Sequence, residues 1–326
     1  MKSTARAYAN IALIKYWGNL NEELRLPLNN TISFNLDQMY TTTTVEFSPD
    51  YLEDIVFIND QHIGGTKKDR VISHINRFRV LAAKDYKVKV VSKNSFPTGA
   101  GIASSASAFA ALSLACSSAL ELNLNERELS LIARLGSGSA ARSIPGGFVE
   151  WIASDKHEES YAYQIASPEY MDLVDIVAIV IETEKKTGST DGHKTASTSP
   201  YHKARINYVS EEVNTVRKAI LEKDLDSMGN IIENDALALH FVAMTSNPHL
   251  FYWESLTLEI IKAVQNWRKD GIKAYFTIDA GANVHILTTF EYADHVEKNL
   301  KEIQGIIKFS RNKPAGPAYI LNEDLF

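Results

Sequence analysis

The segment FPTGAGIASSASAFAAL, residues 96–112, constrains the fold more than any other part of the chain. Ten consecutive positions in it, 99–108, carry no side chain larger than leucine. Gly99 and Gly101 can adopt positive φ angles and admit a ligand close to the backbone, and Ser104 begins a predicted alanine-rich helix. Such a helix start offers unpaired N–H groups and the positive end of a helix dipole, which together bind anions. From this segment alone, close packing of a helix start against a sheet is an equal alternative.

The composition is that of an ordinary globular protein whose main partner is not a nucleic acid. With 326 residues, 45% of them hydrophobic and 23% charged, the chain can form one large core or two smaller ones, and we predict two lobes. The net charge of −6 argues against the clustered excess of Lys and Arg that a phosphate backbone requires. The single cysteine, Cys116, lies in the apolar run LSLACSSAL, so we predict a core residue and no disulfide within the chain.

The sequence contains no feature typical of secretion or of a membrane-spanning helix. The basic residues of the N-terminal MKSTARAYAN are not followed by an apolar segment. The longest apolar run, DIVAIVIE, is far too short to cross a bilayer and is typical of a buried strand. We therefore expect a cytoplasmic protein with no membrane partner.

The first half of the chain alternates strand-like and helical patterns without a regular βαβ repeat, which favours an α+β fold. Alternating β-branched residues predict strands, and apolar spacing predicts one long helix. The strands are expected at 41–47, 55–60 and 86–92, and the helix at 67–83. Asn125 followed by Glu128 predicts a capping box at the start of a further helix, which ends at Gly136.

A polar segment rich in Gly, Ser and Thr, near residues 183–200, follows the buried strand and predicts a boundary or a mobile loop. We place the junction between the lobes there, which gives an N-terminal lobe of residues 1–183 and a C-terminal lobe of residues 184–326. In the second lobe the patterns predict helices at 211–224, 225–241 and 256–271, and strands at 274–281 and 283–289.

Three polar residues in small-residue clusters are candidates for chemistry, although each also has a structural explanation. Lys15 lies in the apolar run IALIKYW, where it either serves a site or lies at a strand edge with its amine in water. Asp279 follows the strand-like AYFTI, and its carboxylate either serves a site or bonds its own backbone in a turn. Arg142, in GSGSAARS, either binds an anion or pairs with loop carbonyls or a surface acid.

Taken together, these clusters resemble a known family. PTGAGIASSA, residues 97–106, resembles the phosphate-binding motif P-x-x-x-G-L-x-S-S-A of the GHMP kinase superfamily, with Ile102 at the leucine position. More narrowly, six motifs are similar in order and spacing to those of the mevalonate diphosphate decarboxylase family, over about residues 5–287. These motifs are NIALIKYWGN, LPLNNTISFNL, GIASSASAFAAL, GSGSAARSIPGGFVEW, KKTGST and DAGAN.

The resemblance implies a two-lobed fold of the GHMP kinase type, with the active site in the cleft between the lobes. The N-terminal lobe would be ribosomal-protein-S5-domain-2-like and bind ATP, and the C-terminal lobe would be ferredoxin-like and carry the catalytic aspartate. The implied activity is an ATP-dependent decarboxylation in the mevalonate pathway of isoprenoid biosynthesis. The 3-hydroxyl of mevalonate 5-diphosphate is phosphorylated, and loss of that phosphate with CO2 gives isopentenyl diphosphate. The resemblance also implies a homodimer.

The same resemblance assigns catalytic roles by position. Asp279 matches the catalytic aspartate, which accepts or orients the proton of a poorly nucleophilic tertiary alcohol. Lys15 matches the lysine beside it, which keeps the carboxylate ionised and offsets phosphate charge. Arg142 matches the arginine that holds the anionic substrate, where a guanidinium fork binds carboxylate or phosphate oxygens and fixes the direction in which CO2 departs.

Other matched positions are expected to bind the two substrates. Tyr16, Ser137, Ser139 and Asn19 would line the substrate pocket. The ATP phosphates would be bound by Gly99, Gly101, Ser104, Ser105, Ser107 and, from the KKTGST loop, Ser189. ATP chemistry also implies Mg2+, and because the sequence offers no obvious carboxylate cage we expect ATP and water to hold the ion.

Two positions depart from the family pattern. DAGAN has Ala282 where the family has proline, which loosens a turn in the unfolded chain and changes the chemistry little. KYWGN has Asn19 where the family has a lysine that contacts the terminal phosphates of the substrate. The loss of this cation leaves open a decarboxylase or 3-kinase acting on mevalonate 5-phosphate or mevalonate. A non-catalytic small-molecule binder on the same fold is a further alternative.

The histidines do not add a metal site to this prediction. His193, His240 and His285 lack the spacing of metal ligands, and we interpret them as structural.

Overall fold

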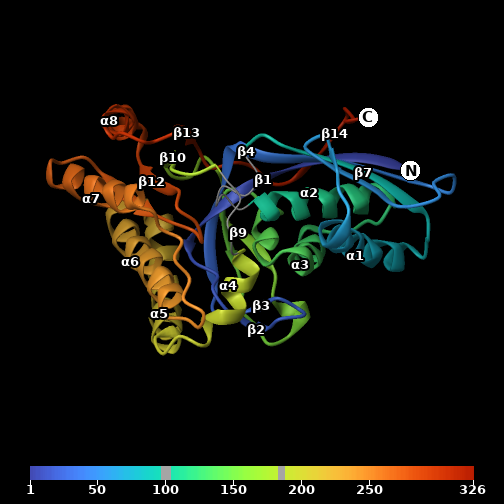
Figure 1. Cartoon of the computed structure of the whole chain (residues 1–326), viewed down its shortest axis with the longest axis horizontal. Coiled ribbons are helices and arrows are strands. Elements are labelled where there is room, and N and C mark those ends of the chain that lie inside the picture. The colour runs from blue at the N-terminus through green and yellow to red at the C-terminus, as the bar shows by residue number, and fades with distance from the viewer. Residues whose placement is uncertain (97–103, 183–187) are drawn as a thin grey trace.

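The computed structural model describes residues 1–96, 104–182 and 188–326, which fold into two lobes of mixed helix and strand (Figure 1). The N-terminal lobe is built on an eight-stranded sheet and the C-terminal lobe on a four-stranded sheet. The predicted two-lobed α+β fold is confirmed.

The N-terminal sheet has the strand order β14-β1-β4-β7-β5-β6, and β8 and β9 extend it from β4. Its pairings are antiparallel, apart from the parallel pair of β5 with β7. The strands predicted in this lobe correspond to β4, β5 and β7, although residues 59–60 form a turn after β5 and β7 begins at Lys87. The sheet consists of β1 (Lys2–Ile14), β4 (Thr31–Ser48), β5 (Ile55–Ile58), β6 (Gln61–His62), β7 (Lys87–Asn94), β8 (Phe148–Trp151), β9 (Ala162–Ala166) and β14 (Tyr319–Leu321).

Helices cover one face of this sheet, as Figure 1 shows for α1, α2 and α3. The buried alanines of α2 allow it to pack closely on the sheet, and Cys116 lies in its core as predicted. The predicted capping box of α3 is confirmed, because Asn125 accepts from the Glu128 backbone N–H and Glu128 accepts from that of Asn125. The helical segments are α1 (Gly65–Ala82), α2 (Ser104–Ala119), α3 (Glu126–Gly136) and the 3-10 turns Gly138–Ser143 and His157–Glu159.

The C-terminal lobe has an antiparallel sheet of order β11-β12-β10-β13. One face of β10 packs against α7 and α8 through Ile176, Ile260 and Val296. The helices and strands predicted from residue 211 onward correspond to α5, α6, α7, β11 and β12, but the strand predicted at 274–281 ends at Thr277, so Asp279 lies beyond it. The lobe consists of β10 (Val174–Ile179), α5 (His202–Glu222), α6 (Leu225–Met244), α7 (Ser255–Lys269), β11 (Ala274–Thr277), β12 (Val284–Thr288), α8 (Phe290–Glu302) and β13 (Lys308–Asn312).

The other face of β10 belongs to a hydrophobic core that both lobes share. Val177 of β10 and Val213 of α5 are in the same buried cluster as Leu13 of β1 and Phe34 of β4. A shared core of this kind holds the ends of β1 and β11 in a fixed relation, and the candidate residues follow those ends.

The change from one sheet to the other occurs earlier than the predicted junction at 183/184. β10 already pairs with β12 and β13, so the structure places the change of sheet between β9 and β10. β14 then returns to pair with β1. The polar segment that suggested a junction instead contains helix α4 (Ser189–Ala196), and its residues 183–187 lie outside the described residues.

A short hairpin of β2 (Asn19–Asn21) and β3 (Leu26–Pro27) lies next to α4 (Figure 1), and the two are linked by a hydrogen bond from the Gly18 N–H to His193 Nδ1. Within the described parts of the chain, no helix is both long and apolar enough to span a membrane.

Candidate active site

A cavity of about 390 Å³ lies where the ends of β1 and β11 meet the starts of α2 and α4. Both lobes contribute to its walls. It is lined by Ala12, Lys15, Tyr16, Trp17, Arg25, Arg70, Ser104, Ser105, Ser137, Gly138, Ser139, Arg142, Gly188, Ser189, Thr190, His193, Leu239, Asp279 and Ala280. Nine of the residues predicted for the site are among them: Lys15, Tyr16, Ser104, Ser105, Ser137, Ser139, Arg142, Ser189 and Asp279.

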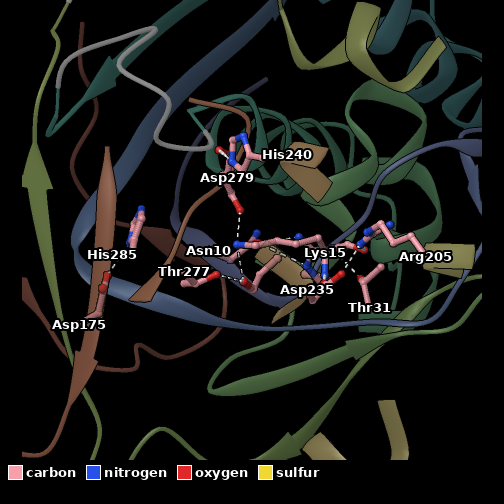
Figure 2. Close-up of polar contacts among 12 residues, drawn as sticks. Asn10, Lys15, Thr31, Asp175, Arg205, Asp235, His240, Thr277, Asp279 and His285 are labelled. Atoms are coloured by element: carbon pink, nitrogen blue, oxygen red, sulfur yellow. Dashed lines mark hydrogen bonds and ion pairs between the residues drawn. The ribbon is translucent and has the colours of Figure 1, made fainter. Parts of the chain in front are cut away.

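Asp279 and Lys15 form an ion pair at the cavity wall (Figure 2). Lys15 Nζ lies 2.7 Å from Asp279 Oδ1 and also donates to the Ala12 carbonyl at 2.7 Å. The Lys15 side chain is only 1% exposed, so the alternative of an edge-strand lysine with its amine in water is wrong. The Asp279 side chain is 23% exposed, toward the cavity. Among the residues that the structure describes, the hydrogen bond and ion pair of this carboxylate go to Oδ1, which leaves Oδ2 to accept a proton.

The ion pair keeps Asp279 ionised. Burial, the largest single influence, would raise the pKa of this carboxyl, but the charge and hydrogen bond of Lys15, together with smaller contributions from His285 and Arg142, bring the pKa below its ordinary value. Burial acts on Lys15 in the opposite sense and lowers its pKa, against the attraction of Asp279. Because the pair is in contact, we assign the charged form to both groups. The result is a carboxylate base held beside a fixed cation.

Two buried charges from the C-terminal lobe hold the backbone of Lys15. Asp235 of α6 accepts the Lys15 N–H at 2.6 Å, and Arg205 of α5 donates to the Lys15 carbonyl at 3.0 Å. Arg205 and Asp235 are themselves paired at 2.7 Å (Figure 2). These contacts tie the end of β1 to the helices of the other lobe. The sequence analysis missed both residues, because a charge on a helix gives no indication of its partner.

A histidine orients the backbone of Asp279. His240 Nε2 lies 3.1 Å from the Asp279 carbonyl oxygen (Figure 2). Burial, together with the charge of Lys15, lowers the pKa of His240 to about 3, so the ring is neutral and its Nε2–H donates this bond. His285 bonds Asp175 at 2.8 Å inside the C-terminal sheet. Both contacts fit the structural interpretation of these two histidines.

Arg142 is fixed by neutral partners. Its guanidinium donates to Thr31 Oγ1 at 2.6 Å and to Asn10 Oδ1 at 3.1 Å, and the residue is almost fully buried. Burial lowers the pKa of Arg142 to about 10, which leaves it a cation at neutral pH. The alternative of pairing with a surface acid is therefore wrong. A buried guanidinium with neutral partners at a cavity wall is suited to an anionic ligand.

The predicted phosphate-binding serines divide into two groups. Ser104 and Ser105, at the start of α2, line the cavity, and Ser105 Oγ lies 3.0 Å from Ser137 Oγ. Ser107 does not line it, because its hydroxyl turns into the core and bonds Thr41 Oγ1 at 2.7 Å. Gly99 and Gly101, predicted for the same site, lie outside the described residues.

The residues predicted to line the substrate pocket are only partly found at the cavity. Tyr16 lines the cavity, whereas Asn19 does not: it accepts from the Tyr16 hydroxyl and donates to Glu22 Oε2 at 2.9 Å. His193, which we interpreted as structural, has a structural contact and a place at the cavity. It accepts a hydrogen bond from the Gly18 N–H at 2.9 Å, and it also lines the cavity. Burial lowers the pKa of His193 to about 3, so this ring is also neutral.

Arg25 and Arg70 line the cavity but were not predicted. Arg70 is one of several basic residues in the helix around 67–83, and nothing in the sequence distinguishes it from its neighbours. Arg25 lies in a short hairpin that has no clear strand pattern. Only the three-dimensional arrangement brings them to the cavity.

We predict that α4 exchanges its backbone amide protons about tenfold more slowly when a nonhydrolysable ATP analogue and substrate are bound together. The helix begins at the cavity, and Gly188 at its N-cap provides no side-chain hydrogen bond, so ligand contacts to Ser189 and Thr190 would be its main N-terminal restraint. Hydrogen exchange with mass spectrometry measures this, with α8 as the internal control. Equal protection of α4 in the free and bound protein would contradict the ordering of this helix by the bound ligands.

Comparison with known proteins adds independent information to this geometry. The chain matches two family models, described as "Diphosphomevalonate decarboxylase-like N-terminal domain" over residues 7–162 and "Mevalonate 5-diphosphate decarboxylase C-terminal domain" over residues 175–316. A curated relative, the phosphomevalonate decarboxylase of Haloferax volcanii, is 33% identical over 324 residues, which cover 99% of this chain and 98% of the relative.

Two solved structures are similar over nearly the whole chain. The mevalonate diphosphate decarboxylase from Staphylococcus aureus has a TM-score of 0.94 at 34% identity, with 98% of each chain covered. The structure described as MDDEF in complex with MVAPP, AMPPCP and magnesium has a TM-score of 0.93 at 37% identity, with 98% of this chain and 99% of that chain covered.

Proposed function

This chain belongs to the diphosphomevalonate decarboxylase family, and we propose that it catalyses the ATP-dependent decarboxylation of mevalonate 5-diphosphate to isopentenyl diphosphate. The observation that carries the proposal is the ionised Asp279 paired with the buried Lys15 at the wall of a cavity that Arg142 also lines. A non-catalytic binder would not need a carboxylate base held in this way, so the retained pair argues against that alternative.

The roles follow from the contacts. Oδ2 of Asp279 accepts the proton of the tertiary 3-hydroxyl as that oxygen becomes phosphorylated. Lys15 holds the carboxylate in its basic form and offsets negative charge as it develops. The bond from the tertiary carbon to the phosphorylated oxygen then breaks, phosphate leaves, and the electrons of the C–CO2 bond form the alkene.

Arg142 would orient the substrate. Its guanidinium cannot turn freely, because Thr31 and Asn10 accept hydrogen bonds from it. A cation fixed in this way binds the substrate carboxylate or a phosphate in a single orientation, which sets the direction in which CO2 departs.

We propose that ATP binds at the start of α2. Ser104 and Ser105 offer hydroxyls and helix N–H groups there, and Ser189 faces the same cavity from α4. From the family resemblance alone, we also propose that Gly99 and Gly101 bind the ATP phosphates. Within the described residues no group of His, Cys, Asp or Glu is arranged to hold a metal ion. We propose that Mg2+ would be held mainly by ATP and water. The Mg2+ would neutralise phosphate oxygens; the MDDEF complex with an ATP analogue and magnesium supports this cofactor pair.

A second candidate substrate is mevalonate 5-phosphate, and two observations favour it. Asn19 carries no charge and is engaged with Tyr16 and Glu22. The Haloferax volcanii relative is a phosphomevalonate decarboxylase. Against it stand the two family models, both of which describe diphosphate enzymes.

We expect Asn19→Lys to lower KM for mevalonate 5-diphosphate a few-fold and to leave kcat nearly unchanged. A solvent-accessible charge contact contributes about 1 kcal/mol or less, and a phosphate remote from the reacting carbon contributes mostly uniform binding. Steady-state kinetics with mevalonate 5-diphosphate, mevalonate 5-phosphate and mevalonate make the comparison. If the wild type prefers mevalonate 5-phosphate in kcat/KM, and Asn19→Lys shifts that preference toward the diphosphate, then mevalonate 5-phosphate is the substrate of this enzyme.

We further propose that the enzyme is cytoplasmic and a homodimer. The homodimer rests on the family resemblance.

A further inference from the structure

Arg25 occupies an unfavourable backbone conformation at the cavity. It directly precedes β3 in the hairpin, and its φ of 49° lies in the left-handed region, which non-glycine residues seldom adopt. Strained positions of this kind tend to cluster where a side chain must point in a required direction. Arg25 lines the cavity.

The charge of Arg25 has no counterion in the described parts of the chain. Its Nε donates to the Leu135 carbonyl at 3.2 Å, which satisfies one N–H and neutralises no charge. No carboxylate of a described residue lies within ion-pair distance of it, and most of its donors are therefore free for a ligand.

A second unpaired guanidinium lies close by. Arg70 donates to the Gly136 carbonyl at 2.9 Å, one residue from the carbonyl that Arg25 uses, and it too has no carboxylate partner among the described residues. Arg70 is an exposed residue, but partial desolvation of its guanidinium lowers its pKa to about 10, and the positive charge of Arg25 adds to this effect. Two cations that repel each other at a cavity wall are stabilised by an anion between or beside them.

The field of Arg25 reaches the substrate side of the cavity. After burial, its charge is the main influence that lowers the pKa of His193, and it opposes the rise in the pKa of Tyr16. Both residues line the cavity beside the hairpin. Arg142 acts on the same two groups, with a smaller effect than Arg25, and in addition lowers the pKa of Asp279 at the reacting end. Among these groups, Arg25 therefore acts on the hairpin side of the cavity, while Arg142 acts on the hairpin side and on the reacting end.

We propose that Arg25 is a specificity-determining residue whose guanidinium binds the phosphate end of the substrate, a contact that the uncharged Asn19 on the same hairpin does not make. The identity of the substrate rests on the proposed function, whereas the requirement for an anion rests only on the unpaired guanidinium. A phosphate there would accept two parallel N–H bonds from Arg25.

The test is the affinity of Arg25→Gln for mevalonate 5-diphosphate, measured by calorimetry without ATP. We expect Kd to rise about tenfold or more in Arg25→Gln and kcat to stay within about threefold of wild type. The Kd of Arg25→Lys should lie between those of the wild type and Arg25→Gln. The KM for ATP is expected to be unchanged. Arg127→Gln, which removes an exposed guanidinium of α3 outside the cavity, is the matched control and should bind as wild type does.

A compensating change makes the test sharper. In the Arg25→Gln background, Asn19→Lys restores a cation to the same hairpin and should recover most of the lost affinity, whereas in the wild type it gains only a few-fold. Equal gains in the two backgrounds would mean that the two positions do not serve one phosphate.

The outcomes separate this inference from the proposed function. Unchanged substrate affinity in Arg25→Gln overturns the inference, and so does a loss confined to ATP, which would assign Arg25 to the nucleotide. If wild type neither binds nor turns over mevalonate 5-diphosphate, the proposed function fails. The same variants are then titrated with inorganic diphosphate, and equal binding by wild type and Arg25→Gln overturns the inference separately.

Discussion

Asp279→Asn is expected to lower kcat about 10³-fold or more while ATP and mevalonate 5-diphosphate still bind. The amide retains the size of the side chain but removes the ionised oxygen, Oδ2, that faces the cavity and accepts the proton. Single-turnover kinetics give the chemical step, and calorimetry gives the affinities. Asp85→Asn, an exposed carboxylate in a surface loop, is the matched control. Near-normal turnover by Asp279→Asn, with a native melting temperature, would remove this residue from the mechanism.

Lys15→Met is expected to lower kcat about 10²-fold and to shift the acidic limb of its pH profile upward. In the wild type, Lys15 holds the pKa of Asp279 below its ordinary value, so the carboxylate stays ionised through the mildly acidic range. Without the ammonium, burial outweighs the smaller lowering effects of His285 and Arg142, and the pKa of Asp279 rises. Activity should therefore fall at a higher pH as the solution is acidified, because the base becomes protonated sooner.

Steady-state kcat across pH 4 to 8 (roughly the range in which a perturbed carboxyl titrates) measures this shift. Lys15→Arg keeps the positive charge and, like the wild type, should show no loss of activity from protonation of Asp279 within this range. An unmoved limb in Lys15→Met, from a protein that is folded by circular dichroism, would show that Lys15 does not control the ionisation of Asp279.

The elements with strong local patterns could be predicted from the sequence. The capping box at Asn125 and the threonine-rich run of β4 depend on neighbouring residues, so a local pattern was sufficient. The junction between the lobes could not be predicted in the same way. Its signal was a polar segment, but sheet membership is decided by which strands pair, and β10 pairs with strands more than 100 residues later in the chain.

The residues of the candidate site also differ in whether a local motif was sufficient to predict them. Asp279, Lys15 and Arg142 lie in motifs, and the structure brings all three to one cavity. Ser107 lies in the same motif as Ser104 but three residues further along the helix, where its hydroxyl meets Thr41 of the sheet. The motif alone did not reveal that the direction of the side chain had changed.

The residues that the sequence analysis missed act through distant partners. Asp235 and Arg205 form hydrogen bonds to the backbone of Lys15 from two helices of the other lobe. The position of Arg25 depends on its left-handed backbone conformation, which no local sequence pattern predicts. Contacts of this kind depend on tertiary packing, which a single sequence does not specify residue by residue.

The central claim is that one cavity couples ATP consumption to the loss of CO2. Its most direct test is to measure ADP and CO2 together from mevalonate 5-diphosphate labelled at the carboxyl carbon, with wild-type enzyme, ATP and Mg2+. We predict one CO2 for each ADP, and neither product above background from Asp279→Asn. ADP formed without CO2 would identify a 3-kinase, and CO2 released without ATP would contradict the phosphorylation step; either result would contradict the claim.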